Sequence, residues 1–471
     1  MTTIVWFRRD LRLADNPALR HAAAHGPVVA AFIVDETDPR PPGGASRWWL
    51  HHSLAALERS LGAMVYLSGD PLTELCKLVG ETGADAVFWN RCYEPHAIKR
   101  DKAIKAALAD AGIAARSFNA GLLAEPWELA TGAGEPYKVF TPFWRALSAR
   151  GYEKPLGRAR PGGAAPAGIG TRLDALDLLP SGPNWAAGWN RIWTPGEAGA
   201  AARLDRFVAD GLAGYATLRD RPDLAHVSRL SPHLHFGEIS PRQVFARVDW
   251  AAGEDAALSP DVEKFRSEIG WREFSHHLLY HYSDLPAANW KDTFDAFPWR
   301  ESAADLAAWQ RGMTGYPLVD AGMRELWRTG TMHNRARMVA ASFLTKHLRI
   351  DWRHGQAWFW DTLVDADLAN NAAGWQWVAG SGADAAPYFR IFNPTTQARR
   401  FDPDGAYIRR WCPELATLPD ADIHAPFEAD NGMLAQAGIR LGETYPEPIV
   451  DHGEARAAAL AAYGTIGAGR G

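Results

Sequence analysis

Cysteine is scarce in this chain of 471 residues. Its three cysteines, Cys76, Cys92 and Cys412, lie far apart, and no Cys-x-x-Cys pair occurs. An iron–sulfur cluster, or a zinc site built from cysteine alone, needs four such ligands. Three scattered thiols cannot supply them, so the sequence excludes these metal centres.

Long apolar runs are also missing. Residues 1–10 form a short apolar run that ends in charge, which suits a buried strand and is too short for a secretory signal peptide. No stretch approaches the roughly 20 apolar residues of a membrane-spanning helix. Hydrophobic residues make up 47% and charged residues 22% of the chain, as in an ordinary globular protein. We expect a cytoplasmic, monomeric protein that does not associate with membranes.

Basic residues are not in excess, because 50 Lys and Arg stand against 55 Asp and Glu. The net charge of −5 argues against a generally basic nucleic-acid binder, which neutralises phosphates with Lys and Arg. The charge is unevenly spread, however. Residues 324–353 hold seven Lys and Arg and two acids, and residues 390–410 hold five Arg and two Asp. These clusters would form either a basic patch or solvated helix faces, and charge alone favours solvated faces.

The first 130 residues alternate short apolar runs with amphipathic segments. This alternation predicts an α/β domain with a doubly wound, mostly parallel sheet. The loop after the first strand, residues 8–12, contains no glycine, so the dinucleotide fingerprint Gly-x-Gly-x-x-Gly is missing and a nicotinamide dehydrogenase is disfavoured. The strands are expected at residues 3–7, 28–34, 64–67, 86–89 and 114–118, and the helices at 46–61, 71–81 and 95–111.

Glycine and proline mark a connection in the middle of the chain. They make up nine of the twenty residues from 151 to 170, which predicts a segment draped over the surface as far as about residue 195. Long helical periods follow, without convincing strands. We expect an α/β domain over residues 1–130, a connection over 131–197 and an all-α domain over 198–471. Helices of the last are expected at 262–282, 305–311, 319–329, 334–348 and 355–363.

Tryptophan is abundant, with 21 residues. Most of them, including Trp48 and Trp49, are expected in the core, where large aromatic side chains pack. Indole also stacks on flat ligands and is among the side chains that are easiest to oxidise. The positions of the tryptophans therefore decide whether any of them has a chemical role.

Two predicted helices each place polar and apolar groups at positions i, i+3 and i+4, which lie on one helix face. The two sets are Glu268, Trp271 and Arg272, and Asn334, Arg337 and Met338. Such side chains could bind a flat base through hydrogen bonds to its edge and apolar contact with its face. A buried salt-bridge network between packed helices would show the same spacing, which does not decide between the two.

Two carboxylates, Asp365 and Asp367, precede two amides, Asn370 and Asn371. These groups are costly to bury without partners, and they would suit the N–H groups of a heterocycle. Paired acids also bind metals or act in acid–base catalysis, but no histidine cluster accompanies them in the sequence. We therefore expect no bound metal.

A hydroxyl-rich loop over residues 227–232 is predicted to open a helix. Its backbone N–H groups, with Ser228 and Ser231, could hold a phosphate. An ordinary helix cap would use the same residue types, so this signal is weak by itself.

These segments, together with Trp299, Trp352 and residues 384–394, resemble the photolyase/cryptochrome family. The resemblance begins at residues 4–12, Ile-Val-Trp-Phe-Arg-Arg-Asp-Leu-Arg, and covers nearly the whole chain. It implies an α/β domain that carries a light-harvesting pigment and an all-α domain that binds FAD.

The resemblance implies a flavin site in the helical domain. Residues near the hydroxyl-rich loop would hold the phosphates and ribose, Asp365 and Asp367 would bond the ribityl and isoalloxazine side, and Asn371 would face flavin N5. Arg337 would pair with an acid there. Val227 stands where many members have Thr, and Phe265 where many have Trp, so each departure could cost one contact. The implied flavin contacts are Tyr215, Val227, Ser228, Arg229, Leu230, Ser231, Phe265, Arg272, Arg337, Asp365, Ala366, Asp367 and Asn371.

The resemblance also implies UV-damaged DNA as the partner. A flipped-out dimer would lie among Glu268, Trp271, Asn334, Met338 and Trp377. The DNA backbone would contact Arg219, Arg335 and Gln397. The implied reaction is electron transfer from excited, fully reduced FADH⁻ into the cyclobutane ring, which splits and returns the electron. Glu268 would hydrogen-bond the dimer and stabilise its charge, rather than remove a proton.

Three tryptophans, Trp375, Trp352 and Trp299, correspond to the indoles that carry electrons from the surface to photoexcited, oxidised flavin in this family. With Glu268 and Asn334 they form the implied catalytic set. The redox role applies to this part of the tryptophan excess only.

The branch of the family is indicated by several positions. Where His333-Asn334 stands, a (6-4) photolyase usually has His-His, and plant-type cryptochromes usually have Asp at the position of Asn371. Residues 46–50 and 230–237 resemble plant cryptochromes and the bacterial class III dimer photolyases closest to them. We expect a cyclobutane-dimer photolyase of class III or class I. A blue-light receptor without repair is the main alternative, and a light-independent flavin enzyme is a more distant one.

The second pigment is less well defined by the sequence. The branch resemblance favours 5,10-methenyltetrahydrofolate as the antenna, while a deazaflavin or an empty site stays open. Glu94, in the run Asn-Arg-Cys-Tyr-Glu-Pro of residues 90–95, is the expected contact.

Overall fold

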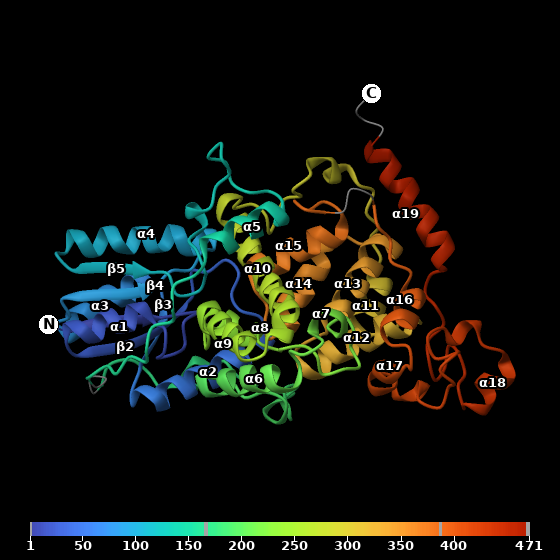
Figure 1. Ribbon diagram of the computed structural model, residues 1–471, viewed down its shortest axis with the longest axis horizontal. Coiled ribbons are helices and arrows are strands. Elements are labelled where there is room, and N and C mark those ends of the chain that lie inside the picture. Colours follow the sequence, from blue (N-terminus) through green and yellow to red (C-terminus); the bar gives the residue numbers. More distant parts are fainter. Residues whose placement is uncertain (1, 164–167, 386–388, 468–471) are drawn as a thin grey trace. The chain divides into compact units, whose positions relative to one another are not determined.

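The computed structural model describes residues 2–163, 168–385 and 389–467. Ala386, Pro387 and Tyr388, which belong to the run 384–394, lie outside the described residues. The chain forms two compact units (Figure 1). The first unit comprises Met1–Ala213, Ser228–Ser283 and Val364–Ala369, and the second comprises Gly214–Val227, Asp284–Leu363 and Asn370–Gly471.

The first unit contains a five-stranded sheet in the order β3-β2-β1-β4-β5, and every neighbouring pair is parallel. This confirms the predicted α/β architecture. Strand order reverses between β1 and β4, and such a switch point leaves a crevice at the carboxyl ends of the strands. The strands are β1 (Thr3–Phe7), β2 (Val28–Asp35), β3 (Val65–Gly69), β4 (Ala86–Asn90) and β5 (Ala114–Phe118).

Helices cover both faces of this sheet. Alternate residues of a strand point to opposite faces, so Val5 and Phe7 belong to one core and Ile4 and Trp6 to another. The first core includes residues of α1 and α2, and the second includes residues of α3 and α4. These helices are α1 (Pro17–His25), α2 (Gly44–Leu61), α3 (Pro71–Thr82) and α4 (Pro95–Asp110).

Trp48 and Trp49 are packing residues, as expected. Both are buried in the first core. The ring of Trp48 lies 5.2 Å from that of Trp189, and the ring of Trp49 lies 5.2 Å from that of Trp193. The described part of the connection is therefore more tightly packed than its glycine and proline content indicates, because it inserts two buried indoles into the core.

Five further helices belong to the first unit, and α10 is the longest of them. Its Glu273 is buried and accepts a hydrogen bond from the backbone N–H of Leu123 at 2.8 Å, which ties the helix to the segment after β5. Gly270 allows α10 to approach Trp144, because an added Cβ would lie 2.4 Å from that ring. The helices are α5 (Phe140–Arg150), α6 (Glu197–Asp210), α8 (Ser231–His235), α9 (Pro241–Glu254) and α10 (Ser259–His281).

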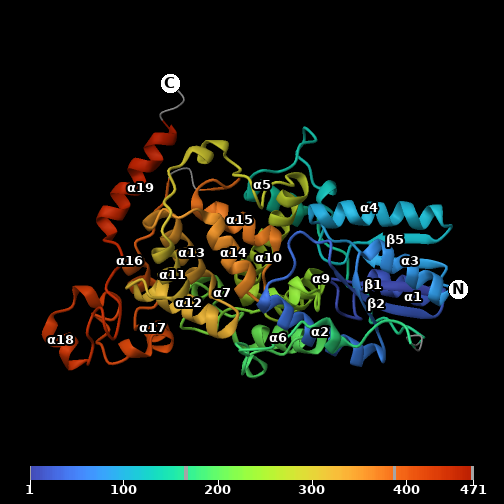
Figure 2. The same ribbon diagram turned by 180° about the vertical axis from the view of Figure 1, so that it is seen from behind.

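The second unit is helical, and its described residues contain no strand beyond an isolated bridge between Leu441 and Tyr445. Helix α19, the red helix labelled in Figure 2, packs against the π-helical turn Phe343–His347. Because this turn is π-helical, the α-helix expected over residues 334–348 ends early, at Ser342. The helices are α7 (Tyr215–Leu218), α11 (Ala303–Arg311), α12 (Pro317–Thr329), α13 (Asn334–Ser342), α14 (Trp352–Thr362), α15 (Leu368–Ala379, which begins in the first unit), α16 (Pro394–Phe401), α17 (Ala406–Trp411), α18 (Asn431–Gln436) and α19 (His452–Gly467).

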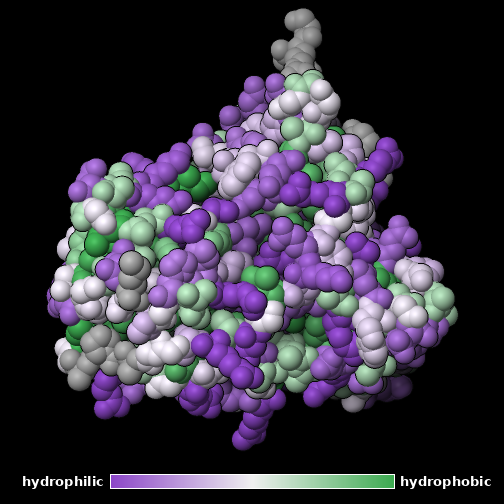
Figure 3. Space-filling model, turned by 60° about the vertical axis from the view of Figure 1, so that its left-hand side comes forward, coloured by the Kyte–Doolittle hydropathy of each residue, from purple (hydrophilic) through white to green (hydrophobic). Residues whose placement is uncertain are grey.

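Hydrophilic residues predominate on the face of the protein shown in Figure 3, and hydrophobic ones are scattered among them. Within the part of the chain that the structure describes, no helix combines the length and the apolar character needed to cross a membrane.

Candidate functional site

The residues that the sequence marks for cofactor, DNA and electron transfer are divided between the two units. The first unit holds Glu94, Ser228, Arg229, Leu230, Ser231, Phe265, Glu268, Trp271, Arg272, Asp365, Ala366 and Asp367. The second holds Tyr215, Arg219, Val227, Trp299, Asn334, Arg335, Arg337, Met338, Trp352, Asn371, Trp375, Trp377 and Gln397.

The hydroxyl-rich loop lies against one of the two expected carboxylates. Ser231 begins α8, as predicted, and its hydroxyl donates a hydrogen bond to Asp365. Before it, the backbone N–H of Leu230 donates to the Ser228 hydroxyl at 3.4 Å, and Arg229 has a left-handed backbone with φ of 53°. This tight turn brings hydroxyl and carboxylate oxygens together, which suits a ligand rich in hydroxyl and N–H groups.

Asp367 is buried among groups that the sequence did not indicate. Its Oδ2 atom lies 3.4 Å from His235 Nδ1, 3.5 Å from His276 Nε2 and 3.9 Å from Arg9 Nη1. Burial by itself raises the pKa of Asp367, but His276 and His235 outweigh that effect and hold this pKa well below its ordinary value. Asp367 is therefore an ionised carboxylate with cationic and hydrogen-bonding neighbours.

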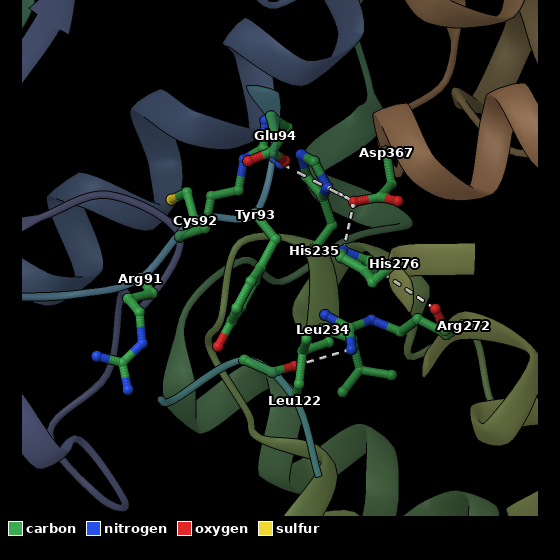
Figure 4. Close-up of a pocket in the computed structure, with 12 residues that line it drawn as sticks. Arg91, Cys92, Tyr93, Glu94, Leu122, Leu234, His235, Arg272, His276 and Asp367 are labelled. Atoms are coloured by element: carbon green, nitrogen blue, oxygen red, sulfur yellow. Dashed lines mark hydrogen bonds and ion pairs between the residues drawn. The ribbon is translucent and has the colours of Figure 1, made fainter. Parts of the chain in front are cut away.

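A pocket that is open to solvent lies just beyond the carboxyl ends of β1 and β4, and Figure 4 shows the residues that line it. Glu94 lines it and forms an ion pair with Arg9, which also contacts Asp367. The pocket therefore lies at the strand-order reversal, where open parallel sheets bind ligands. Its lining comprises Arg9, Arg91, Cys92, Tyr93, Glu94, Gly121, Leu122, Leu234, His235, Arg272, His276 and Asp367.

The three side chains expected on one face of α10 differ in their surroundings. Glu268 forms an ion pair with Lys264 at 2.8 Å, one turn earlier on the helix. Trp271 stacks on Phe140, with ring centroids 3.7 Å apart and planes 9° apart. Arg272 instead donates to the carbonyl of Gly121 at 2.8 Å, next to the pocket. Arg272 thus belongs to a network between segments, and all three side chains are partly exposed.

Phe265 keeps an aromatic contact where many family members have Trp. Its ring lies 4.6 Å from that of Phe207 in the first unit. The smaller ring therefore still packs on a neighbour, although it lacks the N–H group of an indole.

The second predicted set lies on α13. Asn334 is exposed at the start of this helix, and its amide nitrogen is 3.8 Å from the Met338 sulfur. Arg337 donates to the carbonyl of Met332 at 2.8 Å and to the hydroxyl of Thr331 at 3.5 Å. The expected pairing of Arg337 with an acid stays a prediction.

The three residues expected to touch DNA are close together in the second unit. Arg335 forms an ion pair with Asp220 at 2.7 Å, and Arg219 lies 3.7 Å from the same carboxylate. The guanidinium of Arg335 also covers the ring of Phe401 at 4.2 Å, and Gln397 lies one turn before Phe401 on α16. Two guanidinium groups and one carboxylate therefore lie together within the second unit, with one positive charge in excess.

Trp375 is buried in an aromatic environment on α15. Its ring lies 5.0 Å from that of Phe359 and 6.1 Å from that of Trp309. It also packs directly on α14, because a Cβ added at Gly355 would lie 2.0 Å from the indole. Trp377, two residues further along α15, is partly exposed.

The other two tryptophans of the expected relay differ in their exposure to solvent. Trp352 is fully buried, and its indole N–H donates to the Asn289 side chain at 2.9 Å. Trp299 is partly exposed and packs on Phe297, with ring centroids 4.4 Å apart. Trp375 and Trp352 are therefore both buried, and Trp299 is partly exposed; the relay role of the three stays a prediction.

The donor groups present fit FAD. Asn371 donates to the backbone carbonyl of Gln356 at 3.0 Å, and Gln356 Nε2 is buried with no hydrogen-bond partner among the described residues. A buried amide donor of this kind can bond an acceptor on a bound ligand or an ordered water. Within the first unit, the hydroxyl and carboxylate oxygens of Ser231 and Asp365 suit a ligand chain that carries hydroxyl groups.

Metal ligands do not gather in the described residues. No group of three His, Cys, Asp or Glu side chains there could hold a metal ion. The cysteines are dispersed as well, with Cys412 buried, Cys92 partly exposed and Cys76 exposed.

Sequence patterns missed three residues around Asp367 in the first unit and one residue, Gln356, in the second. His235 and His276 contact Asp367, and Arg9 links Asp367 to Glu94. One signal was present, because His276 follows Arg272 by one helical turn and so shares its face. The orphaned amide of Gln356 depends on tertiary packing and has no local signature.

Comparison with known proteins identifies the family. A model of the DNA photolyase domain matches residues 3–161, and a model of the FAD binding domain of DNA photolyase matches residues 265–465. Deoxyribodipyrimidine photo-lyase of Agrobacterium fabrum is 54% identical and covers 98% of both chains. Cryptochrome-1 of Arabidopsis thaliana is 42% identical and covers 97% of this chain and 69% of its own length.

Solved structures agree with this assignment. A bacterial class III photolyase from Agrobacterium tumefaciens has a TM-score of 0.95 and 53% identity, and covers 99% of this chain and 97% of its own. The cryptochrome of Synechocystis has a TM-score of 0.89 and 28% identity, with 98% of each chain covered. The chain therefore belongs to the photolyase/cryptochrome family and carries the FAD-binding domain of DNA photolyase.

Proposed function

We propose that this protein repairs cyclobutane pyrimidine dimers in DNA with the energy of light, as a deoxyribodipyrimidine photo-lyase of the bacterial class III branch. The observation that carries the proposal is the match over 98% of both chains to a protein of that name, at 54% identity. The class III structure with a TM-score of 0.95 supports the branch.

FAD in its fully reduced form, FADH⁻, is the proposed cofactor, and when it absorbs blue light it supplies the electron that opens the cyclobutane ring. The protein binds and orients this group. The loop from Ser228 to Ser231 and the carboxylate of Asp365 would hold its polar chain, and Gln356 would give its orphaned N–H to an acceptor on the ring system. Asn371, held by the Gln356 carbonyl, would present its amide to the ring.

The lesion would be held by side chains of α10 and α13. Glu268 would exchange its partner Lys264 for the dimer and stabilise negative charge on it by hydrogen bonding. Asn334 would bond the base edge, and the Met338 sulfur, 3.8 Å from its amide, would contact a base face. Trp271 and Trp377 would provide the apolar walls.

Phosphates of the DNA would replace Asp220 beside Arg219 and Arg335, with Gln397 as an uncharged contact. The ion pairs at 2.7 and 3.7 Å hold both guanidinium groups close to one carboxylate, so they are oriented before DNA arrives. Such contacts position the backbone and leave recognition of the lesion to the pocket that receives the flipped bases.

Asn334 and Asn371 favour cyclobutane dimers over (6-4) lesions and repair over signalling. A blue-light receptor is the second candidate, and the 42% identity with Cryptochrome-1 of Arabidopsis thaliana favours it. The two candidates differ in whether light changes the lesion.

The test uses full-length protein with bound, chemically reduced FAD and two oligonucleotides, one with a cyclobutane thymine dimer and one with a (6-4) lesion. Blue light should remove the cyclobutane dimer, as seen by chromatography of the product, and leave the (6-4) lesion intact. An equal dimer content in illuminated and dark samples would contradict repair and favour the receptor.

We also propose 5,10-methenyltetrahydrofolate as the antenna, with Glu94 as a contact. The pocket beside Glu94 at the carboxyl ends of β1 and β4 supports a pigment near this residue. An absorption spectrum of the isolated protein should contain a methenyltetrahydrofolate band in addition to that of flavin. A deazaflavin spectrum, or flavin alone, would overturn the assignment.

A further inference from the structure

The basic side chains around Asp367 all approach the same carboxylate oxygen atom of this residue (Figure 4). His235 Nδ1, His276 Nε2 and Arg9 Nη1 all approach Oδ2, at 3.4, 3.5 and 3.9 Å. They come from three separate elements, namely α8, α10 and the loop after β1. The carboxylate and both imidazoles are nearly excluded from solvent, since each side chain is 7% exposed. In such surroundings an interaction between charges is screened weakly.

The hydrogen bonds of His276 define its protonation state. Its Nδ1 lies 3.0 Å from the backbone carbonyl oxygen of Arg272, which can only accept a hydrogen bond. Its Nε2 faces the carboxylate of Asp367, which is also an acceptor. A neutral imidazole carries one N–H group and would turn a lone pair toward one of these oxygens. Both contacts are favourable only when His276 carries two protons and a positive charge.

His235 has the complementary state. Burial lowers the pKa of His235, against the influence of Asp367, so this imidazole is neutral and donates from Nδ1 to the carboxylate. Burial alone raises the pKa of Asp367, but His276 and His235 lower it further than burial raises it. His276 thus supplies a charge to Asp367, and His235 supplies a hydrogen bond.

The remaining charged groups around this cluster have other partners. Arg9 forms an ion pair with Glu94, and its distance to Asp367 is the longest of the three. Asp365, on the same segment as Asp367, accepts a hydrogen bond from Ser231. Arg272, on the same helix as His276, contacts Gly121 and Glu273, and burial raises the pKa of Glu273. His276 is therefore the cation nearest to Asp367.

We propose that His276 is a positioning residue of the flavin site, which holds Asp367 ionised and in one orientation so that this carboxylate can bond FAD. The inference rests on the proposed function, because the flavin contact of Asp367 follows from the family. His276 itself acts through Asp367 and through no bond to the cofactor.

The experiment measures release of FAD from the full-length protein as the pH is lowered from 7 to 3. Flavin fluorescence rises on release, and circular dichroism shows whether the protein is still folded. The folded-state pKa of Asp367 is lowered, so its stabilising contribution is present above its ordinary value and is lost as the pH falls through the lowered one. In His276→Gln the cation is missing, and FAD should leave at a pH higher by about one unit or more.

His277→Gln is the matched control. His277 is the adjacent residue on α10 and is also buried, but its Nε2 accepts from the backbone N–H of Tyr137 at 3.1 Å. Burial lowers the pKa of His277 to about 4, so it carries no charge at pH 7. This variant should release FAD at the pH of the wild-type protein.

Asp367→Asn completes the test. It should remove the acid-dependent step, and His276→Gln should cause no further shift in this background. A wild-type release pH in His276→Gln, or an equal shift in the Asp367→Asn background, would overturn the inference. If His276→Gln does not fold, an unchanged acid step in Asp367→Asn overturns it instead. Wild-type protein that binds no FAD would contradict the proposed function itself.

Discussion

At the scale of single residues, the environment of Trp375 is the part of the proposed relay that the structure defines best. The indole is buried, and its nearest ring neighbour is Phe359 at 5.0 Å. Water is excluded from such a site, so an electron that this indole gives to the flavin must be replaced from another side chain rather than from solvent.

Trp375→Phe should abolish photoreduction of oxidised FAD and leave repair by chemically reduced protein intact. The phenyl ring fits the space but is much harder to oxidise than indole. Absorption spectra during illumination measure the first property, and dimer removal after chemical reduction measures the second.

Trp89→Phe is the control for this prediction. Trp89 is buried in the sheet core, where its indole N–H bonds Asp101 at 2.9 Å. Its replacement should leave both properties unchanged. If Trp375→Phe lost repair as well as photoreduction, the relay assignment would fail, because an electron relay is not needed once the flavin is reduced.

The sequence predicts the environment of some side chains in the site and not that of others. Asp367 was expected from the cost of burying paired carboxylates, and the family resemblance gave it a ligand. His276 and Gln356 were not expected, since their surroundings come from segments far apart in the chain. The protonation of His276 depends on the Arg272 carbonyl, one turn away, and on the Asp367 carboxylate, on another segment. The sequence does not show that these two groups lie beside the same imidazole.

At the scale of elements, the packing of α14 on α15 depends on one glycine. An added Cβ at Gly355 would lie 2.0 Å from the Trp375 ring, far closer than any real contact. Helix α14 begins at Trp352 because the Asp351 side chain accepts from the backbone N–H of Arg353 at 2.9 Å, and this start fixes the position of Gly355 on the helix.

Gly355→Ala should lower the free energy of unfolding by about 1–3 kcal/mol, because the methyl group overpacks a buried contact. It should also slow photoreduction by displacing the indole. Denaturant unfolding and illumination of the oxidised protein measure the two effects.

Gly374→Ala provides the comparison on the neighbouring helix. Apart from the flanking residues and the helix's own backbone, no atom of the described residues lies within 4 Å of a Cβ added at Gly374, directly before Trp375. Removing a glycine from a helix interior should therefore raise stability, by about 0.5–1 kcal/mol. Equal stability of the two variants would show that the close approach at Gly355 does not exist in solution.

Elements were predicted well where local patterns determine them. The five strands occur where apolar runs indicated them, and β1 has the predicted bounds. The prediction of one helix over 334–348 was less accurate, because residues Phe343–His347 form a π-helical turn. The local composition does not indicate this turn. Such a turn reflects packing against other helices rather than propensity.

At the scale of the whole molecule, an acidic protein is proposed to bind a polyanion. The net charge of −5 is compatible with this only if local surfaces carry the contacts, as Arg219 and Arg335 do within the second unit. Arg335 is a suitable probe, because its charge lies over Phe401 and beside Asp220.

Arg335→Ala should weaken binding to dimer-containing DNA and reduce the salt dependence of the affinity. Loss of one phosphate contact should lower the slope of log K against log salt concentration by about one. Arg440→Ala, which removes an exposed arginine paired with Glu443, should leave the slope unchanged. The same slope in both variants would remove Arg335 from the DNA contact.

Domain organisation was predicted only in outline. The change of pattern near residue 195 predicts where the sheet ends and the helical part of the chain begins. The compact units, however, place 228–283 with the sheet, because contacts such as the 2.9 Å bond from Trp49 to Glu238 join distant segments. Residue composition predicts local secondary structure, but it does not predict in which hydrophobic core a helix packs. The boundaries at residues 130 and 197 stay predictions.

Light-dependent repair is the central claim, and its wavelength dependence tests it most directly. A cyclobutane thymine dimer in an oligonucleotide is incubated with the protein holding fully reduced FAD, under equal photon doses of blue and red light, and ring opening is followed by recovery of thymine absorbance. Reduced flavin absorbs blue light and not red, so the absorbance should recover under blue light only. No recovery under blue light, or equal recovery under both colours, would contradict the account.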